Sequence, residues 1–192
     1  MKTSARRLDA RLGWRVSTWK RFLLVLTCVS ICGAQAGTEG SIGVYQVKAA
    51  FIYNFAKFVE WPHEAFKDSN ERISVCVLGR NPFGSLLADA VEGKTVGTRK
   101  FSVSTISNAS EARACHILFV SAAQSKPARI LLEESKNPYL LTVGESSEFL
   151  AGGGVINLRV QDSHVRIEIN REAASAAKFR ISSRLLSLAA TD

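Results

Sequence analysis

The pattern of apolar and polar positions is most distinctive between residues 45 and 61, where apolar and aromatic side chains crowd a helical stretch. Proline disfavours helical geometry in the residue before it, so Pro62 is predicted to end this helix. Four polar residues interrupt the stretch: Lys48, Asn54, Lys57 and Glu60. At about 100° per residue they scatter around the helix axis, so apolar side chains point nearly everywhere. We expect a helix that is buried on most sides, by its own domain or by another protein.

Short apolar runs and helical segments alternate after this helix. The runs that have the character of buried strands are residues 73–79, 101–106, 116–120 and 139–143. Helices are predicted over residues 85–91, introduced by Asn81-Pro82, and over residues 125–136. Such an alternation of strand and helix favours a parallel sheet with right-handed crossovers.

The alternation of strands and helices ends towards the C-terminus. Residues 155–160 and 165–169 are strand-like runs joined by only four residues, which predicts a β-hairpin. Asn170 is placed to cap a final helical region that carries Leu185 on its apolar face. The predicted fold class is therefore α/β: a single domain with a mostly parallel sheet flanked by helices and a C-terminal β-hairpin.

The N-terminal segment has the features of an export signal. Seven basic residues accompany an apolar run of 11 residues, 22–32. That run is too short to cross a bilayer as a helix, which needs about 20 residues. Two small residues, Ala34 and Ala36, follow at the positions that a signal peptidase reads. We predict that residues 1–36 are a signal peptide removed after Ala36 and that residues 37–192 form a periplasmic domain. The alternative is a short membrane anchor that is never cut.

The signal explains the basic character of the chain. The whole chain has 25 basic and 17 acidic residues, a net charge of +8. Removing residues 1–36 takes away seven basic residues and one acidic residue, which leaves 18 basic, 16 acidic and a net charge of +2. The basic pI therefore belongs to the signal and not to a nucleic-acid surface. We predict no nucleic-acid partner.

Two cysteines, Cys76 and Cys115, remain after the signal is removed. An even pair in an oxidising compartment favours a disulfide. Closing a loop of this length stabilises a fold by about 4 kcal/mol in the chain-entropy model. The alternative is two buried free thiols in neighbouring strands. Two cysteines with no histidine pair nearby cannot complete a metal site, so neither a metal nor another cofactor is predicted.

No pattern of residues indicates catalysis. The three histidines, His63, His116 and His164, are too isolated to form a triad or a metal cluster. The glycines at 152–154 lack the spacing of a phosphate-binding loop and precede a strand, so a tight turn is the better interpretation. We therefore predict a protein that is not an enzyme.

A basic cluster near the C-terminus comprises Lys178, Arg180 and Arg184. A solvated face is one interpretation of it. The other is an anion pocket, because Arg180 stands between the apolar residues Phe179 and Ile181.

Three segments resemble the YfiR family of periplasmic proteins. They are residues 48–62, residues 153–158 together with 165–170 in the predicted hairpin, and residues 173–186. The resemblance spans nearly the whole mature domain, and its first motif is specific because it is long and rich in aromatic residues. The spacing of Cys76 and Cys115 also suits a disulfide of such proteins. A second cysteine pair of some members is missing, because Leu150 and Asn157 stand in the corresponding places.

The resemblance implies a regulator that is not an enzyme. Proteins of this family repress an inner-membrane diguanylate cyclase by binding its periplasmic part, and an outer-membrane lipoprotein relieves the repression by sequestering them. For this chain the resemblance implies lower cyclic di-GMP and less biofilm.

We expect contacts with the cyclase from the exposed part of the first helix, through Lys48, Ile52, Phe55 and Val59. Ordinary core packing is the alternative for the apolar ones. Arg180 and Arg184 are expected to tune the binding of a partner or a ligand. A homodimer would suit a helix that is apolar all round.

A different class of function also fits the predicted fold. A periplasmic small-molecule-binding module would hold its ligand at the strand ends of the α/β sheet. This alternative predicts a concave pocket with converging polar groups near Arg180.

Overall fold

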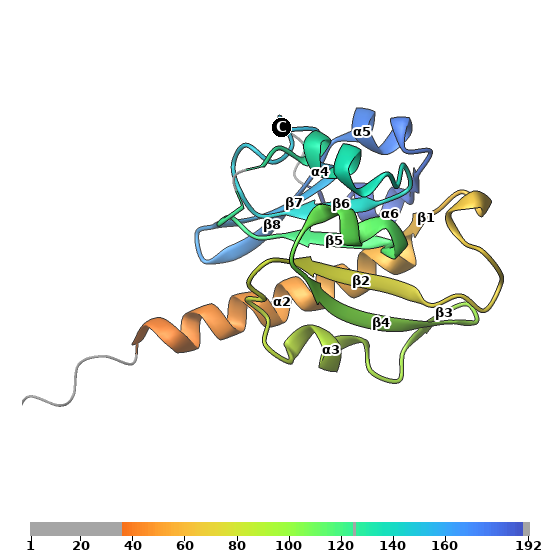
Figure 1. Ribbon diagram of the computed structural model, residues 1–192. Helices are drawn as coiled ribbons and strands as arrows, with labels where there is room; N and C mark the ends of the chain where they lie inside the picture. The colour runs from red at the N-terminus through yellow and green to blue at the C-terminus, as the bar shows by residue number, and fades with distance from the viewer. Residues whose placement is uncertain (1–35, 125, 190–192) are drawn as a thin grey trace, which may run out of the picture. The chain divides into compact units, whose positions relative to one another are not determined.

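We describe the protein from a computed structural model, which covers residues 36–124 and 126–189. The chain divides into two compact units after Glu39. The second unit, residues 40–192, contains every strand among the described residues (Figure 1). The predicted signal peptide, residues 1–36, lies outside the described residues except for Ala36, the first residue of helix α2.

Seven strands form one sheet in the order β3-β4-β2-β5-β6-β7-β8. The strands are β2 (Ile73–Leu78), β3 (Thr95–Val96), β4 (Arg99–Ile106), β5 (Ile117–Val120), β6 (Leu141–Gly144), β7 (Ile156–Gln161) and β8 (His164–Ile169). The five strands from β4 to β7 are parallel, and β3 and β8 are antiparallel strands at the two edges. The predicted α/β class, with a mostly parallel sheet and a hairpin formed by β7 and β8, is confirmed.

The order of the parallel strands reverses in the middle of the sheet. The chain starts at β2, moves outward to β4 and then returns to β5 on the other side of β2. In open α/β sheets, ligands bind outside the carboxyl ends of the strands at such a reversal. Strand β6 lies next to β5, so the residue that follows it, Glu145, reaches the same edge of the sheet.

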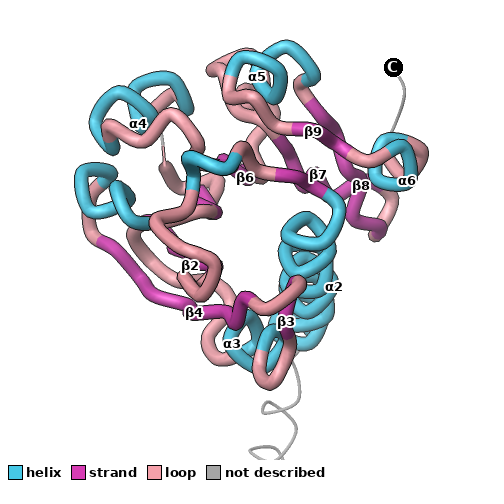
Figure 2. Tube along the Cα trace, turned by 90° about the vertical axis from the view of Figure 1, so that its right-hand side faces the viewer, coloured by secondary structure: helices cyan, strands magenta, loops and turns pink. Residues whose placement is uncertain are grey.

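Helices cover both faces of the sheet (Figure 2). Helices α2 (Ala36–Phe58) and α3 (Leu86–Val91) lie on one face. The 3₁₀ helix η2 (Ala109–Ala114) and helix α4 (Ala128–Ser135) lie on the other. Side chains alternate along β2, so Val75 and Val77 join the apolar cluster under α2, whereas Cys76 and Leu78 join the cluster under η2 and α4.

The C-terminal segment packs beside the end of α2. It comprises α5 (Arg171–Ala176), β9 (Arg180–Ile181) and α6 (Ser183–Leu186). Strand β9 pairs antiparallel with β1 (Val59–Glu60), and the short helix η1 (His63–Ala65) follows β1. The helix predicted to end at residue 61 therefore ends at Phe58, because the next two residues leave it to pair with β9.

Of the two helix starts predicted at asparagines, one is confirmed and the other is wrong. The Asn170 side chain accepts a hydrogen bond from the Ala173 N–H at 2.9 Å, which confirms the predicted helix cap. The helix start predicted at Asn81-Pro82 is wrong, because the Asn81 side chain instead accepts from the Phe83 N–H at 2.9 Å and closes a turn. Helix α3 begins only at Leu86, after that turn.

The two remaining cysteines form a disulfide. Cys76 lies in β2, Cys115 immediately precedes His116 and β5, and their Cα atoms are 6.0 Å apart. The bridge closes a stretch of 39 residues that includes α3, β4 and η2. The structure therefore contradicts the alternative of two free thiols.

Candidate functional site

A buried ion pair lies at the carboxyl ends of β5 and β6. Lys48 Nζ is 2.5 Å from Glu145 Oε2, and the two side chains are 4% and 7% exposed. The Tyr45 hydroxyl donates to the same carboxylate at 3.2 Å. The backbone N–H of Ala122, two residues after β5, donates to it at 3.0 Å. Tyr45 and Lys48 are three residues apart and so share one face of α2.

These donors occupy both oxygens of the Glu145 carboxylate. Burial, followed by the charge of Glu145 and the hydrogen bond to it, raises the pKa of Tyr45 to about 12. The Tyr45 hydroxyl therefore stays protonated and remains a donor at neutral pH. A carboxylate held in this way ties α2 to the sheet and is poorly placed to act as an acid or base on a substrate. Each member of the pair has a signal in the sequence, a carboxylate directly after a buried strand and a lysine inside an apolar helix, but neither signal identifies the other member.

The four residues of the first helix that were predicted to contact a partner lie in the core. They are Lys48, Ile52, Phe55 and Val59, and each is at most 3% exposed. The prediction that they form an exposed face is wrong. Lys48, Ile52 and Phe55 are three to four positions apart and share the side of α2 that packs on the sheet. Val59 is buried in strand β1, which follows α2. Core packing accounts for the burial of the three apolar residues, and the ion pair with Glu145 accounts for that of Lys48.

Arg180 and Arg184 lie at the surface beside the end of α2. Arg180 Nε is 3.6 Å from Glu60 Oε2, but the two side chains are 85% and 70% exposed, so the attraction is weak. The guanidinium carbon of Arg184 lies 5.4 Å from the centre of the Phe58 ring. Neither arginine lines any of the three cavities described below. The pocket of converging polar groups expected near Arg180 is not among those cavities.

A second buried polar group, His116, lies at the amino end of β5. Its Nδ1 accepts a hydrogen bond from the Ser74 N–H at 3.1 Å. Its ring stacks on Phe66 at 4.4 Å between centroids, and the guanidinium carbon of Arg99 lies 3.7 Å from the centre of Phe66. Burial lowers the pKa of His116 and outweighs the opposing effect of Glu71. The imidazole is therefore neutral at pH 7, and it borders a cavity of about 230 Å³.

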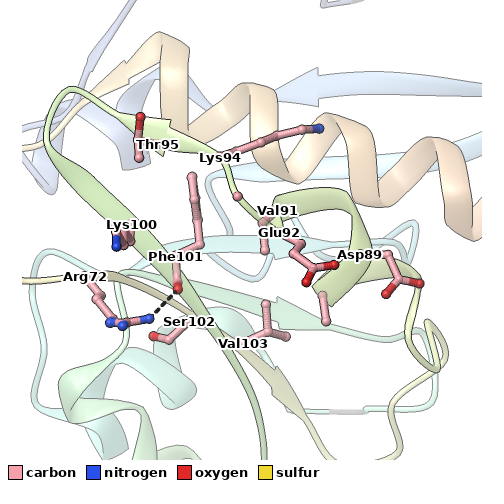
Figure 3. Close-up of a pocket in the computed structure, with 12 residues that line it drawn as sticks. Arg72, Asp89, Val91, Glu92, Lys94, Thr95, Lys100, Phe101, Ser102 and Val103 are labelled. Atoms are coloured by element: carbon pink, nitrogen blue, oxygen red, sulfur yellow. Dashed lines mark hydrogen bonds between the residues drawn. The ribbon is translucent and has the colours of Figure 1, made fainter.

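The largest of the three cavities, about 660 Å³, lies at the β4 edge of the sheet (Figure 3). Residues from the end of α3, from β3 and from the first half of β4 line it, together with Arg72. Its charged lining residues are Arg72, Asp89, Glu92, Lys94 and Lys100. Lys94 is directed away towards α2, where its Nζ lies 4.5 Å from the centre of the Tyr53 ring.

A third cavity, of about 300 Å³, lies between α2, β8 and the residues that follow α6. Phe51, Val165 and Leu188 give it an apolar rim. Two large apolar residues elsewhere on α2 are also exposed: Ile42 at 51% and Val47 at 44%.

Among residues 36–124 and 126–189, no three histidine, cysteine, aspartate or glutamate side chains come together in a way that could bind a metal ion. Among the helices of the same residues, none combines the length and the apolar character needed to span a bilayer.

One solved structure similar to this chain is a conserved domain protein from Vibrio cholerae. The two share 11% sequence identity and superpose with a TM-score of 0.51. The match covers 76% of this chain and 58% of the Vibrio chain, so this chain spans little more than half of that protein. At this identity the likeness shows the fold alone. Among curated proteins, none matches this chain.

A comparison with family models gives a more specific result. The model described as YfiR/HmsC-like matches residues 45–190, which are most of the chain. The match begins at Tyr45, one of the residues that bind Glu145, and runs past α6. It therefore includes the whole sheet, both cysteines and the C-terminal segment. The chain belongs to the YfiR/HmsC-like family.

Proposed function

We propose that this protein is a periplasmic regulator that binds and represses an inner-membrane diguanylate cyclase, and so lowers cyclic di-GMP and biofilm formation. The family match over residues 45–190 carries the proposal. The Cys76–Cys115 disulfide supports it, because disulfides persist in oxidising compartments such as the periplasm. The predicted signal peptide, residues 1–36, provides the route of export.

The regulation needs no chemistry from this chain. A repressor acts by binding an inactive conformation of the cyclase more tightly than the active one. A hundredfold repression corresponds to about 2.7 kcal/mol of difference between those two binding free energies. A few apolar side chains buried against one conformation are enough to provide it.

We place the contact with the cyclase on the apolar residues that α2 leaves exposed. Ile42 and Val47 are the large ones, and they replace the buried residues Ile52, Phe55 and Val59 as candidates. Ile42 and Val47 are five positions apart, about 140° around the helix axis, so each is proposed as a separate contact and not as part of one patch. Arg180 and Arg184 lie beside the opposite end of α2 and are proposed to tune the binding of the partner or of a ligand.

Two further partners belong to the proposal. A second copy of the chain would make a homodimer, and an outer-membrane lipoprotein would relieve repression by sequestering the protein. If the lipoprotein and the cyclase use the same residues of α2, their binding is mutually exclusive, which is the simplest way for one to release the other.

The test of the function is the cellular level of cyclic di-GMP in a strain that lacks the gene. We expect the level to rise, to return to normal with the full chain, and to stay high with residues 37–192 expressed without the signal. No rise in the deletion strain would refute the repressor function. Equal rescue by both forms would refute the periplasmic site of action.

A charge placed on α2 tests the proposed contact. Val47→Lys is expected to leave folding unchanged and to release repression, because a lysine cannot be buried against an apolar partner without a cost. Val160→Lys is the matched control, since Val160 is equally exposed, at 46%, but lies on the β7–β8 hairpin. Repression by the Val47→Lys protein at the wild-type level would remove this surface from the proposal.

A further inference from the structure

The two edges of the seven-stranded sheet are completed differently. At the β8 edge, Ile167 forms a parallel bridge with Ala189, so later residues of the chain cover part of that edge. At the other edge, β3 pairs with β4 only at Arg99 and Lys100. Beyond Lys100, no strand of the described residues borders the outer side of β4. We call residues 101–106 on that side the open edge.

Part of the backbone of the open edge has no hydrogen-bond partner among the described residues. The Ile106 carbonyl accepts from the Gly79 N–H at 2.8 Å, so the backbone of Ile106 faces β2. Backbone direction alternates along a strand, which means that Ser104 also faces β2. Val103 and Thr105 therefore direct their N–H and C=O groups outward, away from the sheet.

The open edge lacks the usual protection against pairing. Natural sheet edges carry charged residues, prolines or bulges that keep other strands away. Here the three central residues, Val103, Ser104 and Thr105, are uncharged and compatible with a strand. The Phe101 carbonyl is the exception, because Arg72 Nη1 donates to it at 3.2 Å. Arg72 thus limits the open edge at its amino end without covering its centre.

The 660 Å³ cavity runs beside the first half of the open edge. Lys100 to Val103 form its wall on the β4 side, and Ala88 and Val91 of the α3 region give it an apolar part. An extended backbone that added itself to β4 would lie along this cavity, where its side chains would find room on both faces of the sheet.

Charge separates the two faces at this edge. Phe101 and Val103 pack with the cluster under α3, and the acidic residues Asp89 and Glu92 lie on that side (Figure 3). The side chain of Lys100 points to the face of β4 opposite to that of Phe101, and Arg72 lies on the same face as Lys100. The edge is therefore acidic on its α3 face and basic on its other face.

We propose that the open edge of β4 binds an extended segment of a partner protein in which basic and acidic residues alternate. Neighbouring residues of a strand point to opposite faces, so such a segment directs every basic side chain to Asp89 and Glu92 and every acidic one to Arg72 and Lys100. Main-chain bonds to Val103 and Thr105 supply the rest of the affinity. A second copy of β4 is a poorer match, because the strand contains no acidic residue. The inference is independent of the proposed function, whose contact lies on α2.

Two capped peptides, each about as long as the open edge, test the proposal against the protein purified after expression of the whole chain. In the first peptide lysine and glutamate alternate. The second has the same composition, but its lysines and glutamates come in pairs, so each face of the strand receives both charges. We expect the alternating peptide to bind about tenfold more tightly, since each cross-strand charge pair contributes modestly. Its binding should also slow hydrogen exchange at the Val103 and Thr105 amides.

Variants separate the main-chain contribution from the charges. Val103→Pro removes an outward N–H and leaves the pairing with β2 in place, so it should abolish binding, whereas Val103→Thr keeps the N–H and should bind normally. Glu92→Lys, at an exposed position, should remove the preference for the alternating peptide without affecting folding.

Three results would overturn the proposal. One is equal affinity for the two peptides. Another is unchanged exchange of the Val103 and Thr105 amides when the alternating peptide is saturating. The third is protection of both amides without peptide in a protein that sediments as a dimer, because a second copy would then close the open edge.

Discussion

The two ends of the parallel strands each bury a polar group, and they stabilise it by different means. At the carboxyl end, the Glu145 carboxylate meets Lys48, Tyr45 and a backbone N–H. At the amino end, His116 is kept neutral by burial, stacks on Phe66 and accepts one backbone hydrogen bond. A buried charge requires a partner of opposite charge, whereas a buried neutral ring requires only packing and a donor.

This difference determines which change destabilises each end of the sheet. The carboxyl end depends on both members of an ion pair, one of which comes from α2, so the same contact also holds α2 on the sheet. The amino end depends on the protonation state of one ring. It is in addition held covalently, because Cys115, the neighbour of His116, is bonded to Cys76 in β2. Substitution should therefore damage the carboxyl end most, and acid should damage the amino end.

The largest effect is expected from breaking the ion pair. Lys48→Met leaves the Glu145 carboxylate buried without a counter-charge, which destabilises by about 3 to 5 kcal/mol. Urea unfolding followed by circular dichroism measures the loss.

The matched control replaces both members of the pair. The double variant Lys48→Met with Glu145→Leu removes the stranded charge, so it should recover most of the loss and unfold close to the wild-type midpoint. If the single and the double variant were equally destabilised, packing around α2 and not charge would control this end of the sheet.

At the amino end, breaking the disulfide should have the next largest effect on stability. Replacing Cys76 and Cys115 together by alanine should lower the free energy of unfolding by about 2 to 4 kcal/mol, because the unfolded chain regains the freedom of a 39-residue loop. Wild-type protein in dithiothreitol should show the same loss. An unchanged urea midpoint in both cases would mean that β2 and β5 hold this end without the bridge.

The sequence predicts well those features that local residues determine. The β7–β8 hairpin has two strand-like runs around a turn, in which Asp162 and Ser163 adopt positive φ angles of 49° and 62°. The helix cap at Asn170 is likewise set by residues within three positions. The family motifs locate the fold as well, since they include the first helix and the hairpin.

The candidate site was harder to predict, because distant residues build it. Lys48 and Glu145 are 97 residues apart, and a single lysine in an apolar helix does not reveal its partner. The sequence also does not indicate which side of α2 is buried, because the polar residues of the helix are spread around its axis. The sheet determines that side: Ile52 and Phe55 face it and are fully buried, whereas Val47 does not and is 44% exposed.

A smaller effect at the carboxyl end is expected from Tyr45→Phe. The variant loses one hydrogen bond to a carboxylate that keeps two other donors, so the cost at neutral pH should be about 1 to 2 kcal/mol. The pKa of Tyr45 is raised to about 12 in the folded protein, against about 10 when unfolded. Between about pH 10 and pH 12 the native state therefore keeps the Tyr45 proton while the unfolded state loses it. The stability that Tyr45 contributes is lost as the pH rises through this range.

Unfolding curves at several alkaline pH values test this prediction. The difference in stability between the wild type and the Tyr45→Phe variant should be constant below about pH 10 and should narrow towards pH 12. A difference that stayed constant over the whole range would show that the Tyr45 hydroxyl does not interact with Glu145.

The smallest effect at neutral pH, and the one that separates the two ends most clearly, concerns His116. Burial lowers its pKa below the value of about 6.5 that it has when unfolded, so the unfolded state binds the extra proton first. Stability from this group is complete above about pH 6.5 and is lost as the pH falls through the folded pKa. His116→Asn keeps an acceptor for the Ser74 N–H but cannot titrate, so its stability should fall less than that of the wild type between about pH 7.5 and pH 5. Urea midpoints of both proteins across that range provide the comparison. Parallel slopes would mean that acid destabilises the fold elsewhere, and the two ends of the sheet would then not differ in their response to pH.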